Sequence, residues 1–332
     1  MSAPSGACIA QAEGAGKLIL FGEHSVVYGE RAIAVPLTRG LTARAQLQRE
    51  GALAELLIPS FGLRLSEPPD QGAPAMIERL WRVWSICWRF AEACRARRGW
   101  VALDRPSVSV TVTGPLPFKV GLGSSAALGL ALLEVCGRCV GVNLSQDELS
   151  EGAWLTEEVF HDQPSGLDHT VALSSAGLCF QRVEGHLSLA ELTMGGPLYL
   201  TVCWTPRQGG TADAVRAVRE LLARAPARHE SIRRLGVITQ TAEGHLSLAP
   251  SEARLTALAQ LVDEAHEALS ELEVSSPEIE RLRASLKAQG ALGAKLTGAG
   301  FGGAVFGLFS SQVEAESAAV ALDGLSITLG ER

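Results

Sequence analysis

The chain has no excess of positive charge and no long apolar run. Its 29 Lys and Arg residues face 36 Asp and Glu, which gives a net charge of −7. A broad nucleic-acid or anionic-membrane surface needs a basic face, so we expect neither partner. A local anion site is still compatible with this charge, because a few side chains and backbone amides set the field of a pocket.

The sequence also shows no targeting signal and no cysteine pattern typical of disulfides. The longest apolar run, residues 126–133, is far too short to span a bilayer, and the N-terminus shows no basic region followed by an apolar core. The seven cysteines are an odd and scattered set, which predicts reduced thiols and a cytoplasmic location. Cys136 and Cys139 form a CxxC without a second pair at zinc spacing, so packing or surface thiols are favoured over a metal site.

The order of apolar patterns predicts an α+β protein. The 332 residues are enough for two domains or one large one. In each half, strand patterns precede helical ones, and the expected boundary lies near residues 182–196. Residues 50–75 are expected to be irregular. Strands are predicted at 18–21, 32–37, 107–117, 170–182 and 197–206 and on both sides of a glycine turn within 290–311, and helices at 76–97, 125–140, 145–162, 211–225, 251–274 and 277–289.

The stretch "PLPFKVGLGSSAALGLALL", residues 115–133, joins an alternating strand pattern to a helical one. Glycines there allow backbone amides to close on an anion, and the free amides of a helix N-terminus favour phosphate. The lysine of the GxxxxGK[ST] loop is absent. On its own, the stretch leaves a phosphate site and a simple capped helix start both open.

Three further stretches carry chemistry-bearing residues. Lys17 begins a buried strand, where a lysine is costly without a partner, and Glu23 and His24 follow in a loop. Asp168 follows "PSG" and is expected to enter an apolar strand, where it is either a base or ligand or a plain turn aspartate. "KLTGAGFGGAVFGL", residues 295–308, has glycines that fit close approach to a ligand or to another loop.

Taken in order, these stretches resemble the GHMP kinases. "PLPFKVGLGSSAA" is similar to their phosphate-binding motif and "KLTGAGFGGAVFGL" to their C-terminal glycine motif. "GEHSVVYG", "PSGLD" and "LEVSSPEIERL" resemble the mevalonate kinase branch, and the resemblance runs from Lys17 to Phe309. It implies a two-domain α+β fold with an N-terminal ribosomal-protein-S5-like domain (1–188), a C-terminal ferredoxin-like domain (189–332) and the active site in the cleft between them.

The resemblance implies ATP-dependent phosphorylation of the mevalonate 5-hydroxyl, with Mg²⁺ as cofactor and mevalonate and ATP as small-molecule partners. It assigns catalysis to Asp168 as base and to Lys17 as its cationic partner. It places Mg²⁺ on Ser124 and Glu157. ATP is assigned to Pro117, Gly121, Leu122, Gly123, Ser124, Ser125 and Ala126, and the substrate to Glu23, His24, Thr211 and Ala299.

Several positions depart from the family pattern. His169 replaces an asparagine, Ser175-Ala176 stands where paired glycines are common, and Phe301 takes a glycine position. Two extra residues precede Thr211, so its alignment is open. The alternatives are a kinase for phosphomevalonate or another small alcohol, and a non-catalytic ATP-binding regulator; the regulator is disfavoured because Asp168 and Lys17 are present. The oligomeric state is not decided, and a homodimer stays an option.

Overall fold

The computed structural model describes residues 6–102, 105–160, 166–183, 186–206 and 209–330. The chain divides into two compact units. Unit 1 comprises residues 1–16, 37–116 and 123–173, and unit 2 comprises residues 17–36, 117–122 and 174–332. Strands β1 (Cys8–Phe21) and β2 (Ala32–Leu47) each continue from one unit into the other. Because the units interleave along the chain, the boundary between residues 188 and 189 stays a prediction.

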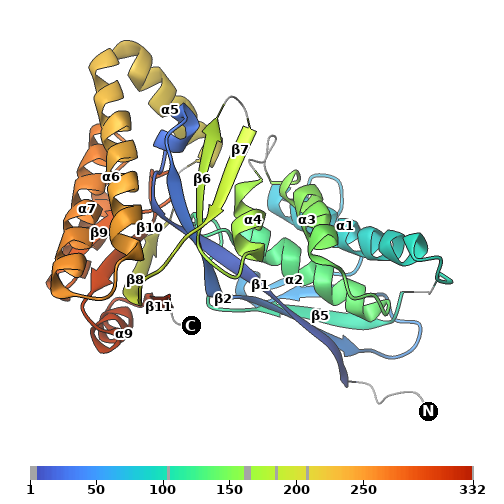
Figure 1. Cartoon of the computed structure of the whole chain (residues 1–332). Helices are drawn as coiled ribbons and strands as arrows, with labels where there is room; N and C mark the ends of the chain where they lie inside the picture. Colours follow the sequence, from blue (N-terminus) through green and yellow to red (C-terminus); the bar gives the residue numbers. More distant parts are fainter. Residues whose placement is uncertain (1–5, 103–104, 161–165, 184–185, 207–208, 331–332) are drawn as a thin grey trace. The chain divides into compact units, whose positions relative to one another are not determined.

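Unit 1 combines a sheet with helices that lie on one side of it (Figure 1). Its strand order is β4-β3-β5-β2, with β1 beside β2; β3 runs parallel to β5 and the other pairings with printed register are antiparallel. Besides its parts of β1 and β2, the unit contains β3 (Glu55–Ile58), η2 (Pro59–Phe61), β4 (Leu63–Leu65), α1 (Ala75–Arg97), β5 (Val108–Thr113), α2 (Ser124–Cys139), α3 (Gln146–Glu157) and α4 (Leu167–Leu173).

Helix α2 is the central element of unit 1. It is mostly apolar and largely buried, with Glu134 and Arg138 on its solvent side, because α1, α3 and α4 all pack against it. It also approaches β1 closely: a Cβ added to Gly14 would lie 1.9 Å from the carbonyl oxygen of Ala127. This packing fixes where the helix begins, and therefore where its N-terminal amides lie.

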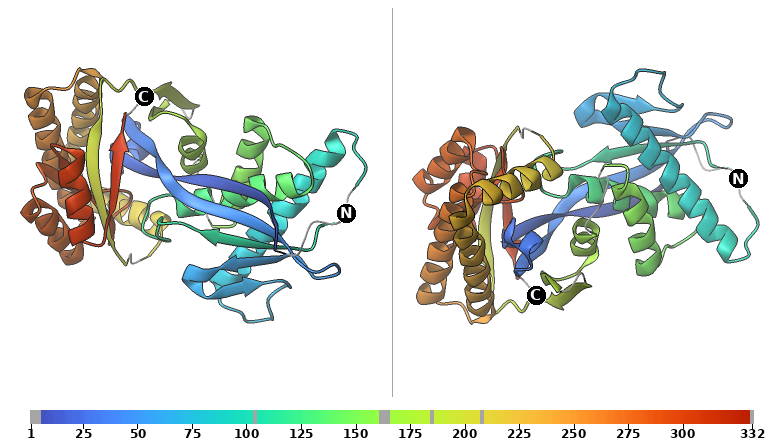
Figure 2. Two further views of the ribbon diagram at one scale, coloured as in Figure 1. Left: turned by 90° about the horizontal axis from the view of Figure 1, so that it is seen from below. Right: turned by 90° about the horizontal axis from the view of Figure 1, so that it is seen from above.

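Unit 2 contains an antiparallel sheet of order β11-β8-β10-β9, in which β10 pairs with both β8 and β9. Helices α7, α8 and α9 pack on this sheet, and α6 packs on α7 (Figures 1 and 2). A second group of strands pairs β7 with β6 and β6 with the first residues of β2. The unit contains η1 (Ser25–Tyr28), β6 (Leu178–Val183), β7 (His186–Glu191), β8 (Leu198–Thr205), α5 (Thr211–Arg224), η3 (Pro226–Arg228), α6 (His229–Ser247), α7 (Glu252–Glu271), α8 (Pro277–Ala288), β9 (Gly293–Leu296), β10 (Gly303–Phe309), α9 (Gln312–Ala321) and β11 (Leu325–Leu329).

The α+β prediction is confirmed, with local corrections. Residues 50–75 are not irregular throughout, since they include β3 and β4, and residues 170–182 are not one strand, since α4 runs to Leu173 before β6 begins. A short apolar run does not distinguish a strand from a buried helix. Helices α6 and α9 and strands β7 and β11 were not predicted. None of the helices in the described ranges combines the length and apolar character that crossing a bilayer requires.

Candidate active site

The N-terminus of α2 presents backbone amides without a side-chain cap. Gly123 is the N-cap residue, with a left-handed φ of 72°, and it makes no side-chain cap hydrogen bond. The first helical residues are Ser124, Ser125 and Ala126, and the first backbone bond runs from Ala127 N–H to the Gly123 carbonyl at 3.0 Å. Ser124 is buried and Ser125 is half-buried. The backbone amides and the helix dipole at this end favour an anion such as phosphate.

The segment that leads to α2 is held by two other glycine-bearing stretches of unit 2. Lys17 N–H donates to the Leu122 carbonyl at 2.9 Å, and Ala304 N–H donates to the Val120 carbonyl at 3.1 Å. A Cβ added to Gly298 would lie 3.6 Å from the Gly121 carbonyl oxygen. Residues 117–122, β1 and the turn between β9 and β10 therefore meet, and Pro117 is half-buried at the start of this segment.

Asp168 lies in the first turn of α4 and not at the mouth of a strand, which corrects the sequence prediction. It is half-buried. Its neighbour His169 is buried, with Nδ1 3.2 Å from Oε2 of Glu157, and its ring packs edge-on against Trp154 at a centroid distance of 6.0 Å. Residues Pro164 and Ser165 of the "PSGLD" motif lie outside the described residues. Since α4 packs on α2 and α3, unit 1 gathers Asp168, Glu157 and the start of α2 on mutually packed helices.

Glu157 has a free acceptor suited to a cation. It is 2 % exposed at the end of α3, and its Oε1 is buried with no hydrogen-bond partner in the described part of the chain. No three His, Cys, Asp or Glu side chains of the described residues cluster as an all-protein metal site would require. Mg²⁺ bound to a nucleotide needs only one or two protein ligands beside phosphate and water. The orphaned oxygen therefore fits the expected ion.

Glu23 and His24 lie in unit 2 at the end of β1, and both are buried. His24 has a left-handed φ of 59°, and its Nε2 lies 3.0 Å from the Ala299 carbonyl oxygen. Glu23 forms a fully buried ion pair with Lys295 of β9. Burial raises the pKa of Glu23, and the ammonium groups of Lys295 and Lys17 oppose this rise. The structure thus joins Lys17, Glu23, His24 and Ala299 in one region of unit 2.

Of the predicted site residues, Thr211 has a place in the structure that gives its assignment the least support. It is exposed as the first residue of α5, where Asp213 accepts from Gly210 N–H at 2.8 Å. Arg207 and Gln208, which precede it, lie outside the described residues. Its alignment therefore stays a prediction.

Sequence reasoning missed Lys295, although it is the buried partner of a predicted site residue. The signal was available, because a lysine inside an apolar strand needs a compensating charge, as was argued for Lys17. It also missed the contact of His169 with Glu157.

Comparison with known proteins assigns the family. The model "GHMP kinases N terminal domain" matches residues 84–176, and "GHMP kinases C terminal" matches residues 250–324, together about half of the chain. The chain belongs to the GHMP kinase family. The region matched in the N-terminal half of this GHMP kinase includes the glycine loop, Glu157 and Asp168.

The similarity extends over nearly the whole kinase. A mevalonate kinase of Thermococcus onnurineus is 30% identical over 320 residues, covering 93% of this chain and 91% of the relative. A mevalonate kinase of Aeropyrum pernix is 33% identical over 302 residues, covering 90% and 88%. The crystal structure of L. major mevalonate kinase in complex with R-mevalonate matches the fold with a TM-score of 0.77, 24% identity and 99% of each chain covered.

Proposed function

We propose that this GHMP kinase transfers the γ-phosphoryl group of ATP to the 5-hydroxyl of mevalonate, giving 5-phosphomevalonate for isoprenoid biosynthesis. The observation that carries the proposal is the likeness to mevalonate kinases along almost the full length of both chains. A cytoplasmic location and a homodimer stay predictions from the sequence.

The nucleotide side of the proposal depends on the start of α2. Phosphoryl transfer needs positioning and charge neutralisation more than covalent chemistry. The amides of Ser124, Ser125 and Ala126 would hold phosphate oxygens, and residues 117 and 121–123 would allow the phosphates close access to the backbone. Mg²⁺ held by Ser124 and Glu157 would neutralise charge on the phosphates.

The substrate side is assigned to charged and polar residues. Asp168 would orient the 5-hydroxyl and accept its proton. Lys17 would stabilise negative charge on the transferring group, and its pairing with Asp168 stays a prediction. Glu23, His24 and Ala299 would shape the mevalonate site, and Thr211 is retained as a weaker candidate. The support from the structure is that Lys17, Glu23 and His24 are polar or charged and nevertheless buried.

A coupled assay of ADP release tests the proposal with mevalonate, phosphomevalonate, homoserine and galactose as substrates. We expect turnover with mevalonate and ATP and little with the other three. Preference for phosphomevalonate would reassign the enzyme within the family, and no turnover with any of them would support a non-catalytic role.

The role of Lys17 is tested by Lys17→Met. We expect kcat for mevalonate to fall by orders of magnitude, because the charge of the transferring group is left uncompensated. Lys287→Met is the matched control, since Lys287 is a half-buried lysine of α8 paired with Asp263. Equal kinetics of the Lys17 variant and the wild type would remove Lys17 from the mechanism.

A further inference from the structure

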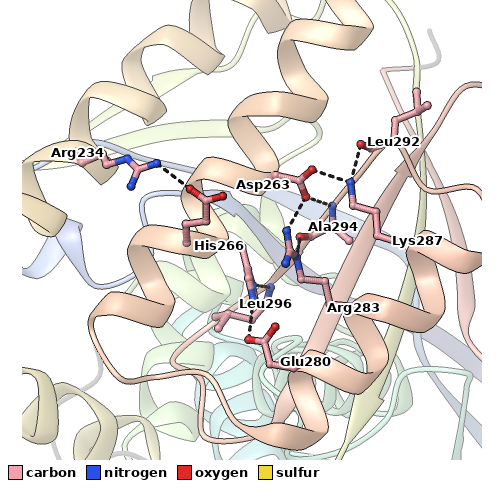
Figure 3. Close-up of polar contacts among 10 residues, drawn as sticks. Arg234, Asp263, His266, Glu280, Arg283, Lys287, Leu292, Ala294 and Leu296 are labelled. Carbon is pink, nitrogen blue, oxygen red and sulfur yellow. Dashed lines mark hydrogen bonds and ion pairs between the residues drawn. The ribbon is translucent and has the colours of Figure 1, made fainter.

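Strand β9 is an edge strand whose outer side is covered by side chains from two helices. It stands last in the order β11-β8-β10-β9, so one row of its backbone groups has no strand partner. Asp263 of α7 accepts from Ala294 N–H at 3.0 Å, and Arg283 of α8 donates to the Ala294 carbonyl at 2.9 Å (Figure 3). Charged side chains therefore replace the missing strand at Ala294.

Two residues further along β9, a histidine also takes the place of the missing strand. Nδ1 of His266 accepts from Leu296 N–H at 3.3 Å, and its Nε2 lies 2.9 Å from Oε1 of Glu280 (Figure 3). These partners fit a neutral ring with its proton on Nε2. Burial lowers the pKa of His266, which favours the same neutral form. Residue 294 is thus fixed to α7 and α8, and residue 296 to α7 through a histidine that α8 in turn holds.

Between these two anchored residues lies Lys295. It is fully buried and donates to Oε1 of Glu23 and, at 2.8 Å, to the Leu296 carbonyl. Its ammonium lies 6.0 Å from the ring centroid of Phe21 and 5.2 Å from that of Phe306. Such distances allow cation–π stabilisation of the buried charge. A buried ion pair tolerates little displacement, because each charge left unpaired carries a large desolvation cost.

The ion pair uses only part of the Glu23 carboxylate. The second oxygen, Oε2, is buried and has no hydrogen-bond partner among the described residues. Buried acceptors are rarely left unsatisfied, so this one indicates a ligand group. His24 follows directly, held by the Ala299 carbonyl. The turn that carries Ala299 is itself tied to β1 by Thr297, whose hydroxyl donates to the Ile19 carbonyl at 2.8 Å.

We propose that Lys295 is a positioning residue for substrate binding: anchored by β9, it holds the Glu23 carboxylate so that Oε2 accepts a substrate hydroxyl, and it thereby sets the place of His24. The inference rests on the proposed function for the identity of the substrate. Its geometric part, the dependence of His24 on Lys295, does not need the substrate.

The experiment compares Lys295→Met with Lys287→Met, in which an ion pair on the outer side of β9 is removed instead. Two measurements are made on each variant: steady-state kinetics with mevalonate, and the ring signal of His24 in long-range ¹H–¹⁵N NMR spectra. We expect Lys295→Met to raise KM for mevalonate at least about ten-fold with a smaller change in kcat, and to shift the His24 signal. Lys287→Met should leave both as in the wild type.

A second variant keeps the proposal testable if Lys295→Met does not fold. The double change Glu23→Gln with Lys295→Gln keeps two hydrogen-bonding side chains of similar length and leaves no buried charge unpaired. Because Glu23 is itself assigned to the substrate site, the deciding readout in this variant is the His24 signal: a shifted signal supports the proposal, whereas a wild-type signal overturns it. A KM shift of equal size in Lys287→Met would also overturn it, because any loosening of β9 would then suffice.

The NMR readout separates the two proposals. If the wild type does not phosphorylate mevalonate but Lys295→Met still shifts the His24 signal, the proposed function fails and the positioning role stands. If mevalonate is a good substrate and neither KM nor the signal responds to Lys295, the positioning role fails alone.

Discussion

Replacing Glu148 with Gln removes one negative charge at a contact between α1 and α3 and leaves the side chain the same size. Both carboxylate oxygens of Glu148 accept from Arg98, each at 2.8 Å. Oε2 also accepts from Ser145 N–H at 2.9 Å, which completes the capping box of α3. A Gln side chain can keep the capping hydrogen bond. The variant therefore isolates the charge-assisted part of the contact.

The magnitude follows from the pKa of Glu148. The hydrogen bonds from Arg98 are the main cause that lowers this pKa from 4.5 to about 2. At about 1.4 kcal/mol for each pH unit, the upper bound on the stability contribution is about 3.5 kcal/mol. The carboxylate side chain is 18 % exposed, and solvent screening reduces the expected loss to about 1–2 kcal/mol at pH 7.

The pH dependence gives the sign of the effect. A depressed carboxyl pKa stabilises the fold above about pH 4.5, and this contribution is lost as the pH falls toward about 2, where the folded protein also binds the proton. Urea unfolding of the wild type and Glu148→Gln should therefore differ at pH 7, the difference should shrink as the pH falls through 4.5 to 2.5, and it should vanish only below about pH 2.

Glu151→Gln provides the control for this prediction. Glu151 lies on the same helix and pairs with Arg97 of α1, but both side chains of that pair are about half exposed. We expect no measurable change in its unfolding midpoint at either pH. A difference between Glu148→Gln and the wild type that persists undiminished at pH 2.5, or an equal loss in the control, would refute the reasoning.

Three other substitutions test the site and its support. Asp168→Asn should lower kcat about 10²–10⁴-fold, the usual contribution of a general base, while the Kd for ATP measured by calorimetry stays unchanged; near-normal turnover would exclude Asp168 as the base. Glu157→Gln should raise the Mg²⁺ concentration needed for half-maximal activity, because the orphaned carboxylate oxygen loses its charge; an unchanged Mg²⁺ titration would exclude it as a ligand. Gly14→Ala should lower the free energy of unfolding by about 1–3 kcal/mol, because the added Cβ meets the Ala127 carbonyl at 1.9 Å; an unchanged thermal midpoint would show that α2 shifts without cost.

Local signals in the sequence predicted the local parts of the fold. The change from alternating to helical apolar spacing at "GLGSS" placed the start of α2 within one residue of Ser124. Ser145 and Glu148 have the spacing of a capping box, and the structure contains one. Both features depend on residues within a few positions of each other, so a short stretch of sequence is enough to predict them.

Asp168 shows where prediction from a short stretch of sequence fails. The run from Thr170 to Leu173 is mostly apolar and only four residues long, which is too short to distinguish the alternating spacing of a strand from the spacing of a helix. Packing of α4 against α2 and α3 makes it a helix, and that packing involves residues distant in sequence. The change matters for the site, because it places the Asp168 carboxylate at the N-terminal end of a helix instead of at the edge of a sheet.

Lys295 shows a second limit. The cost of burying a lysine indicates that a partner exists, but not which carboxylate it is. Its partner Glu23 is 272 positions away, and β9 spans only Gly293–Leu296. The pairing becomes visible only when the fold places β1 beside the turn after β9.

The last glycine motif shows how a departure from the family pattern is accommodated. The sequence left open whether its glycines approach a ligand or another loop. At Gly300 the structure favours the loop, since an added Cβ would lie 2.2 Å from the Val274 carbonyl oxygen. Phe301, which stands where the resemblance to the family leads us to expect glycine, adopts a left-handed φ of 57°, and its N–H donates to the same carbonyl at 2.9 Å. Because this hydrogen bond and the close approach at Gly300 hold the turn, Phe301 keeps the backbone shape that a glycine would give, and the Ala299 carbonyl stays in place for His24.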